Sequence, residues 1–91
     1  MKVKIKLLKP FSDIAGKGEL DLDFPGGSAI QALEKICESY PDLGKELFEE
    51  DGKVSYSVNI FVNDTPLVGE QEDAPLKDGD EILIFLAVSG G

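Results

Sequence analysis

Hydrophobic and polar residues alternate strictly near the start of the chain. Val3, Ile5 and Leu7 occupy every second position, and lysines occupy positions 2, 4 and 6. A period of two predicts a strand with one buried face and one wet face. Residues 19–24 repeat this pattern with acidic residues in place of the lysines. We therefore predict a hairpin with opposite charges across its antiparallel pair, joined by a loop over residues 11–18.

The pattern changes to a helical period after Pro25-Gly26-Gly27, which we interpret as a strand-to-helix turn. Ser28 and Gln31 have the spacing of a capping box, in which each side chain accepts a backbone N–H of the first turn. A helix should follow and end at Pro41, and residues 42–50 predict a further helical turn or two. The apolar residues at helical spacing are Ile30, Leu33, Ile36, Cys37 and Tyr40.

Strand patterning returns over residues 54–63, where Val58, Ile60 and Val62 share one face. A turn over 63–66, a short edge strand at 67–68 and an acidic loop over 69–74 should follow. Asp78-Gly79 then predicts a tight turn. The final strand is apolar on both faces, which is typical of a central strand in a mixed sheet.

This element order predicts an α+β domain of the β-grasp type over residues 1–86. Its mixed sheet should have four to five strands packed on one main helix, with the last strand parallel to the first. Residues 87–91 should form a flexible tail.

The composition and charge exclude several classes of partner. The chain has 91 residues and a net charge of −9, with nine lysines, eighteen acidic residues and no arginine. Phosphate binding needs basic groups, so we expect no nucleic-acid partner and favour partners with basic faces. The N-terminus lacks an apolar signal core and no segment is long enough to span a membrane. We therefore expect a cytoplasmic protein without a membrane partner.

Catalytic chemistry is poorly supported. The chain has no histidine, the commonest general base and metal ligand. Its one cysteine, Cys37, falls on the apolar stripe of the predicted helix, which favours a core residue over a reactive thiol. Asp78-Gly79-Asp80 lacks the ligand series of a calcium loop. We therefore expect no catalytic residues, no metal and no cofactor, and predict that the protein is not an enzyme.

Apolar residues on the other side of the strands predict a docking surface. Leu8, Phe61, Leu83 and Phe85 should face away from the main helix. An apolar patch on an open sheet face usually marks a protein-binding surface. Alternatively, a loop such as residues 11–18 folds over them.

The last residues, Val88-Ser89-Gly90-Gly91, suggest a second site. Gly90 and Gly91 have no side chains, so this slim segment could thread into a narrow channel on a partner. The carboxylate of Gly91 could then be the reactive group. Alternatively, the two glycines are incidental and the protein is a passive interaction module.

Two segments together resemble the C-terminal signature of MoaD-type sulfur carriers: Leu76-x-Asp78-Gly79-Asp80-Glu81-Ile82 and Val88-Ser89-Gly90-Gly91. The capped helix and the strand containing Val62-Asn63 are placed as in that family, so the resemblance covers essentially the whole chain. Small archaeal modifier proteins share this ubiquitin-like scaffold. The chain departs at Leu86-Ala87, where typical members have two prolines.

The resemblance implies a carrier mechanism. An E1-like enzyme, which binds the ATP itself, would adenylate Gly91, and sulfur transfer would then give a thiocarboxylate. That group would donate sulfur in the large subunit of molybdopterin synthase. In the modifier branch, the activated Gly91 would instead be joined to lysines of target proteins. Val88, Ser89 and Gly90 would thread into the activating site.

Overall fold

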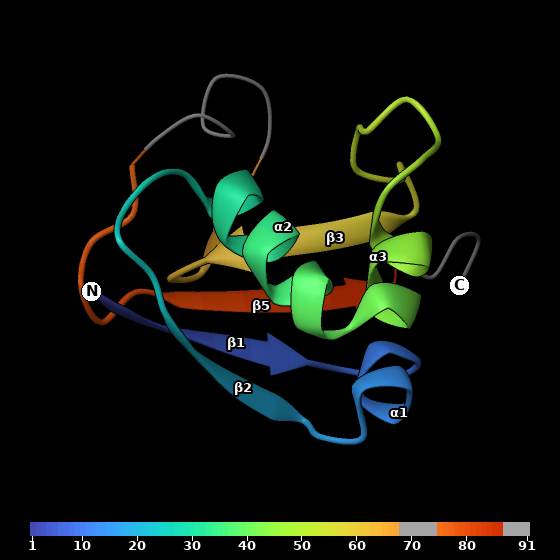
Figure 1. Cartoon of the computed structure of the whole chain (residues 1–91), viewed down its shortest axis with the longest axis horizontal. Coiled ribbons are helices and arrows are strands. Elements are labelled where there is room, and N and C mark those ends of the chain that lie inside the picture. The colour runs from blue at the N-terminus through green and yellow to red at the C-terminus, as the bar shows by residue number, and fades with distance from the viewer. Residues whose placement is uncertain (68–74, 87–91) are drawn as a thin grey trace.

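The computed structural model describes residues 1–67 and 75–86 and consists of a five-stranded mixed sheet with helices on one face (Figure 1). The sheet order is β2-β1-β5-β3-β4. The central strand β5 runs parallel to β1 and antiparallel to β3, as predicted for a last strand that is apolar on both faces. The elements are β1 (Lys2–Leu7), α1 (Phe11–Ala15), β2 (Glu19–Asp23), α2 (Ala29–Ser39), α3 (Pro41–Leu47), β3 (Val58–Val62), β4 (Thr65–Pro66) and β5 (Glu81–Leu86).

The predicted hairpin of β1 and β2 is confirmed, and opposite charges face each other along it. Lys4 pairs with Asp21 and Lys6 with Glu19 in the antiparallel register. The Lys4 ammonium lies 3.4 Å from the carboxylate of Glu19, which is two residues before Asp21 on β2. Lys6 instead contacts Glu81 of β5 at 2.9 Å. The lysine face of β1 therefore links the strands on both sides of it.

The connection between these strands is not the predicted loop. Residues Phe11–Ala15 form α1, and Gly16 closes this helix with a left-handed backbone, φ 77°. Phe11 is almost completely buried in the same core cluster as residues of α2 and α3. The connection therefore packs on the helical side of the sheet, so the alternative that it covers Leu8, Phe61 and Phe85 is wrong.

Helix α2 begins at the predicted capping box. The Ser28 N–H donates to Gln31 Oε1 at 2.9 Å, and the Gln31 N–H donates to Ser28 Oγ at 3.3 Å. Its buried face differs from the prediction, because Ala29 and Ala32 lie against the core while Ile30, Cys37 and Tyr40 are half-buried. Small residues allow close approach of a helix to a sheet, which a search for large apolar residues overlooks. Leu33 and Ile36 are buried as predicted.

The further helical turns predicted after the main helix are confirmed. The segment over 42–50 forms α3 (Pro41–Leu47), directly after α2, and buries Leu43 and Leu47. Helices α2 and α3 both lie in front of the sheet in Figure 1. The core fills the space between these helices and one face of the sheet.

The strand predicted over residues 54–63 begins later than expected. Val54 makes only an isolated bridge to Phe48, and β3 starts at Val58. The turn after β3 has positive φ at Asn63 (49°) and Asp64 (71°), as in the type I′ turns that suit hairpins. The following strand β4 contains Pro66, which is tolerated on an edge strand because its missing N–H breaks no ladder. Val68 and the predicted acidic loop lie outside the described residues.

A clasp of polar groups fixes the start of β5. The Asn63 side-chain N–H donates to Asp80 Oδ1 at 2.8 Å, and the Glu81 N–H donates to Asn63 Oδ1 at 3.0 Å. Asp80 Oδ2 accepts the Lys77 N–H at 2.7 Å, and Asp78 Oδ1 accepts the Lys2 N–H at 2.6 Å. The Asp78-Gly79-Asp80 turn therefore joins β5 to both of its neighbours.

The clasp makes a stability prediction. Asn63→Gly keeps the left-handed backbone but removes both side-chain hydrogen bonds, so it should lower the free energy of unfolding by about 1–2 kcal/mol. Asp64→Gly is the matched control, because Asp64 has the same backbone class and no hydrogen bond to another described residue. It should change stability by less than about 0.5 kcal/mol. Urea unfolding measures both, and equal losses would contradict the clasp.

Candidate functional site: a docking face beside the end of the last strand

The four residues predicted to form a docking surface lie together on the sheet face opposite the helices. Leu83 is paired with Phe61 of β3 on one side and with Lys6 of β1 on the other. The Leu8 N–H donates to the Ile84 carbonyl at 3.0 Å, which continues the β1–β5 pairing and brings Leu8 alongside Phe85. We call Leu8, Phe61, Leu83 and Phe85 the docking face.

Two aromatic rings form the centre of the docking face. The ring centroids of Phe61 and Phe85 are 5.6 Å apart and the rings are inclined by 35°, a geometry in which aromatic rings attract each other. Both rings and Leu83 are half-buried, and Leu8 is 50% exposed. None of the described helices packs on this face. The docking face is therefore accessible to a partner without any rearrangement of the helices.

Charges border the docking face. The Lys6–Glu81 ion pair lies next to Leu83, and the hydrogen bond that the Lys6 ammonium donates to the Glu81 carboxylate raises the pKa of Lys6 above its usual value. Lys2 and Lys4 continue the basic row along β1, and the acidic residues of β2 lie beyond them. This face therefore has an apolar centre with a polar rim, an arrangement that is usual in protein interfaces.

The docking face lies at the same end of β5 as the start of the C-terminal segment. Strand β5 ends at Leu86, which is 41% exposed and directly follows Phe85. Gly91 is five residues further along the chain, a distance of at most about 17 Å. The predicted roles of Val88, Ser89, Gly90 and Gly91 fall outside the described residues. A partner that covers Phe85 would hold a surface within about 20 Å of Gly91.

The remaining candidates have structural roles. Burial, together with a smaller effect of the negative charge of Glu34, raises the pKa of the Cys37 thiol from 9.0 to about 11, so the reactive thiolate is disfavoured. Gly26 and Gly27 have φ of 135° and 138°, as the predicted strand-to-helix turn requires. Among residues 1–67 and 75–86, no group of three or more potential ligands could hold a metal ion.

Sequence patterns alone did not identify the role of Asn63 or of the two aspartates. The turn at 78–80 was predicted, but its contacts to Lys2 and Asn63 were not, because the partners are far apart in sequence. The sequence feature that could have indicated these contacts is the polar residue Asn63 at the end of β3, opposite the start of β5.

A mixed sheet with parallel first and last strands and a helix across one face defines the ubiquitin-like β-grasp fold. The chain belongs to the ThiS family, which matches residues 5–91. It is therefore a member of a family of ubiquitin-like sulfur carriers and modifiers. None of the described helices has the length and apolar character needed to cross a membrane.

Individual relatives support this assignment over nearly the whole chain. The chain is 30% identical over 88 residues to small archaeal modifier protein 1 of Haloferax volcanii, covering 94% of this chain and 97% of that one. It is similar to the solution structure of small archaeal modifier protein 1 from Methanosarcina acetivorans, with 34% identity, TM-score 0.83 and coverage of 99% and 96%. A putative molybdopterin converting factor, subunit 1, from Pyrococcus furiosus has 32% identity, TM-score 0.74 and coverage of 97% and 99%.

Proposed function

We propose that this protein carries sulfur as a thiocarboxylate on Gly91 for the synthesis of molybdopterin. An E1-like enzyme uses ATP to join AMP to the Gly91 carboxylate, with release of pyrophosphate. A sulfur donor at the oxidation level of sulfide then attacks the adenylate carbonyl and displaces AMP, which leaves the thiocarboxylate. Activation is needed because a carboxylate anion is a poor electrophile. The partner enzymes supply the catalytic groups and bind the ATP, and the carrier supplies the end group and the docking face.

The observation that carries this proposal is the family match, which runs through the terminal Gly-Gly to Gly91. The similarity to a molybdopterin converting factor subunit supports a molybdopterin precursor as the sulfur acceptor and the large subunit of molybdopterin synthase as the partner. The clasp supports the mechanism as well, because it gives the chain a firmly anchored last strand before the reactive end.

The similarity to small archaeal modifier protein 1 favours a second use of the same activated end. In this reaction the amine of a target lysine attacks the activated Gly91 carbonyl and displaces its leaving group. The product is an isopeptide bond. Both uses share the adenylation step and differ only in the acceptor.

Mass spectrometry and immunoblotting together test the proposal. The intact protein from its native host should show a fraction in which one oxygen is replaced by sulfur at the C-terminus. A tagged version should give high-mass conjugate bands whose linkage peptides contain Gly91 joined to lysine. A passive interaction module would show neither the sulfur nor ATP-dependent adenylation by any E1-like enzyme of the host, and this result would overturn the proposal.

We expect Phe85→Lys to weaken binding to the adenylating enzyme, because a charge would enter the apolar centre of the docking face. Binding should fall roughly 10- to 100-fold, the range of an interface hot spot. Isothermal titration calorimetry measures the loss, and circular dichroism checks that the fold is retained. Phe61→Lys should act in the same way, whereas Tyr56→Lys, at a residue that is 95% exposed, should leave binding unchanged. Unfolding of either Phe variant would place these rings in the core.

A further inference from the structure

Strand β2 is an outer strand of the sheet, and its outer edge pairs with none of the described strands. In the β1–β2 register, Gly18 and Phe24 are hydrogen-bonded to Leu7 and Met1 at 2.9 and 2.8 Å. Because these bonds alternate along an antiparallel pair, Leu20 and Leu22 also direct their backbone groups toward β1. The backbone N–H and C=O groups of Glu19, Asp21 and Asp23 therefore point outward. These groups make no hydrogen bond to another described residue.

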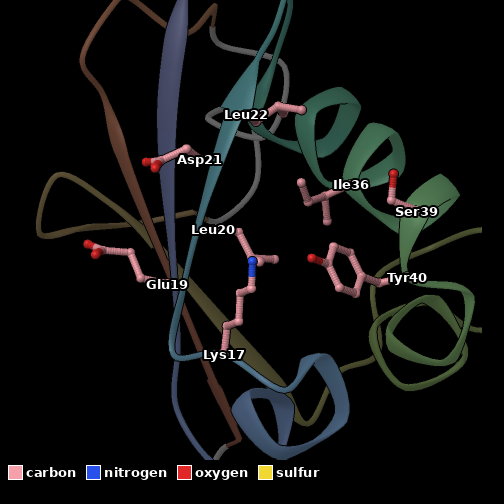
Figure 2. Close-up of a pocket in the computed structure, with 8 residues that line it drawn as sticks. All are labelled: Lys17, Glu19, Leu20, Asp21, Leu22, Ile36, Ser39 and Tyr40. Atoms are coloured by element: carbon pink, nitrogen blue, oxygen red, sulfur yellow. The ribbon is translucent and has the colours of Figure 1, made fainter.

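A groove runs along this free edge, between β2 and the second half of α2. One hollow of about 390 Å³ is lined by residues of β2 and by Lys17, Ile36, Ser39 and Tyr40. Figure 2 shows Leu20, Ile36 and Tyr40 pointing into the hollow, whereas the carboxylates of Glu19 and Asp21 point away to the other side of β2. A second hollow of about 350 Å³ is lined by Lys2, Asp21, Leu22 and Asp23, so it also borders β2 but includes no residue of α2.

We propose that β2 binds an extended peptide in which basic and aliphatic residues alternate, as a sixth strand of the sheet. Added strands use free backbone groups for affinity and alternate side chains for specificity. Peptide residues opposite Leu20 and Leu22 point into the groove, toward Ile36 and Tyr40. Peptide residues opposite Glu19, Asp21 and Asp23 point to the other face, where three carboxylates favour lysine or arginine.

The other edge of β2 already shows this complementarity. Its natural neighbour β1 has the sequence Lys-Val-Lys-Ile-Lys-Leu, with each lysine opposite an acidic residue of β2. The free edge presents the same carboxylates to the opposite side. A second copy of β2 would instead place acid against acid, which is unfavourable. The edge therefore selects a basic strand of another protein over self-association, and it does so independently of Gly91.

Peptide titration of the full chain, followed by backbone amide chemical shifts, tests the proposal. The probe is a capped six-residue peptide that alternates lysine and valine. We expect saturable shifts at Glu19, Asp21, Asp23, Ile36 and Tyr40. A peptide of the same composition with its three lysines before its three valines should bind roughly tenfold more weakly, because it cannot satisfy the three charge pairs and the groove together.

Two controls separate strand addition from general attraction to an acidic protein. Methylating the backbone nitrogen of the central lysine removes an N–H that the Asp21 carbonyl would accept, and this peptide should bind roughly tenfold more weakly. Asp21→Asn should weaken binding roughly twofold or more, whereas Asp64→Asn should not. The proposal is overturned if the alternating peptide and the peptide with its lysines before its valines bind equally. It is also overturned if methylation has no effect, or if the chemical-shift changes centre on Phe61 and Phe85.

Discussion

Deletion of Gly91 is expected to abolish both thiocarboxylate formation and conjugation to lysines while leaving the melting temperature unchanged. The residue lies beyond β5, the last strand of the sheet, so no described core contact is lost. The carboxylate would move to Gly90, about 3.5 Å short of the position that the activating site requires. Intact mass after incubation with the E1-like enzyme, ATP and a sulfur source measures the first loss, and an immunoblot of host lysate measures the second.

A matched variant lengthens the chain instead of shortening it. One alanine added after Gly91 also displaces the carboxylate by about 3.5 Å and should be equally inactive. Cys37→Ser should keep full activity, since the thiol is half-buried and its pKa is raised to about 11. If the Gly91 deletion gave a normal yield of thiocarboxylate, the proposed function would be wrong. The proposal that β2 binds a peptide would be unaffected by that result.

We expect Ile84→Ala to lower the free energy of unfolding by about 2–5 kcal/mol. Ile84 is fully buried in the central strand and lies between Leu7 of β1 and Ile60 of β3. Truncation leaves a cavity where the neighbouring strands cannot close in, because their own hydrogen bonds fix their spacing. This loss is a large share of the roughly 5–15 kcal/mol that stabilises a typical domain. Urea unfolding followed by circular dichroism measures it.

Leu86→Ala is the control on the same strand. Leu86 is 41% exposed, so its truncation should cost less than about 1 kcal/mol. Sequence alternation places it on the same face as Ile82 and Ile84, yet it lies where β5 leaves the core. Equal destabilisation by the two variants would show that the core extends further along β5 than the burial of these residues indicates.

Short-range patterns predicted most of the elements correctly. The alternation of β1 and β2 and the capping box at Ser28 depend on neighbouring residues, and both are confirmed. The two-sided apolar strand was enough to place β5 at the centre of the sheet. Predictions were wrong where small or isolated residues decide the packing: α1 has only five residues, and α2 buries Ala29 and Ala32 in addition to the predicted Leu33 and Ile36.

The candidate sites also divide into one that the sequence predicted and two that it did not. The docking face was predicted from residues that break the alternation, and the structure brings Phe61 and Phe85 to a centroid distance of 5.6 Å. The clasp and the β2 groove were not predicted. Each joins residues that are distant in sequence, such as Asn63 with Asp80 or Leu20 with Tyr40.

By itself, the sequence determined the strand faces, the main helix and its cap, the central last strand, and Gly91 as the proposed carrier of the chemistry. The structural features follow from local periodicity and from the properties of individual side chains, and the role of Gly91 follows from the resemblance to MoaD-type sulfur carriers. Only the tertiary structure decided that α1 packs on the helical side of the sheet, how Asn63 anchors the start of β5, and that the outer edge of β2 pairs with no described strand and lies beside a groove. Those features depend on the register between distant strands, which no local pattern of residues specifies.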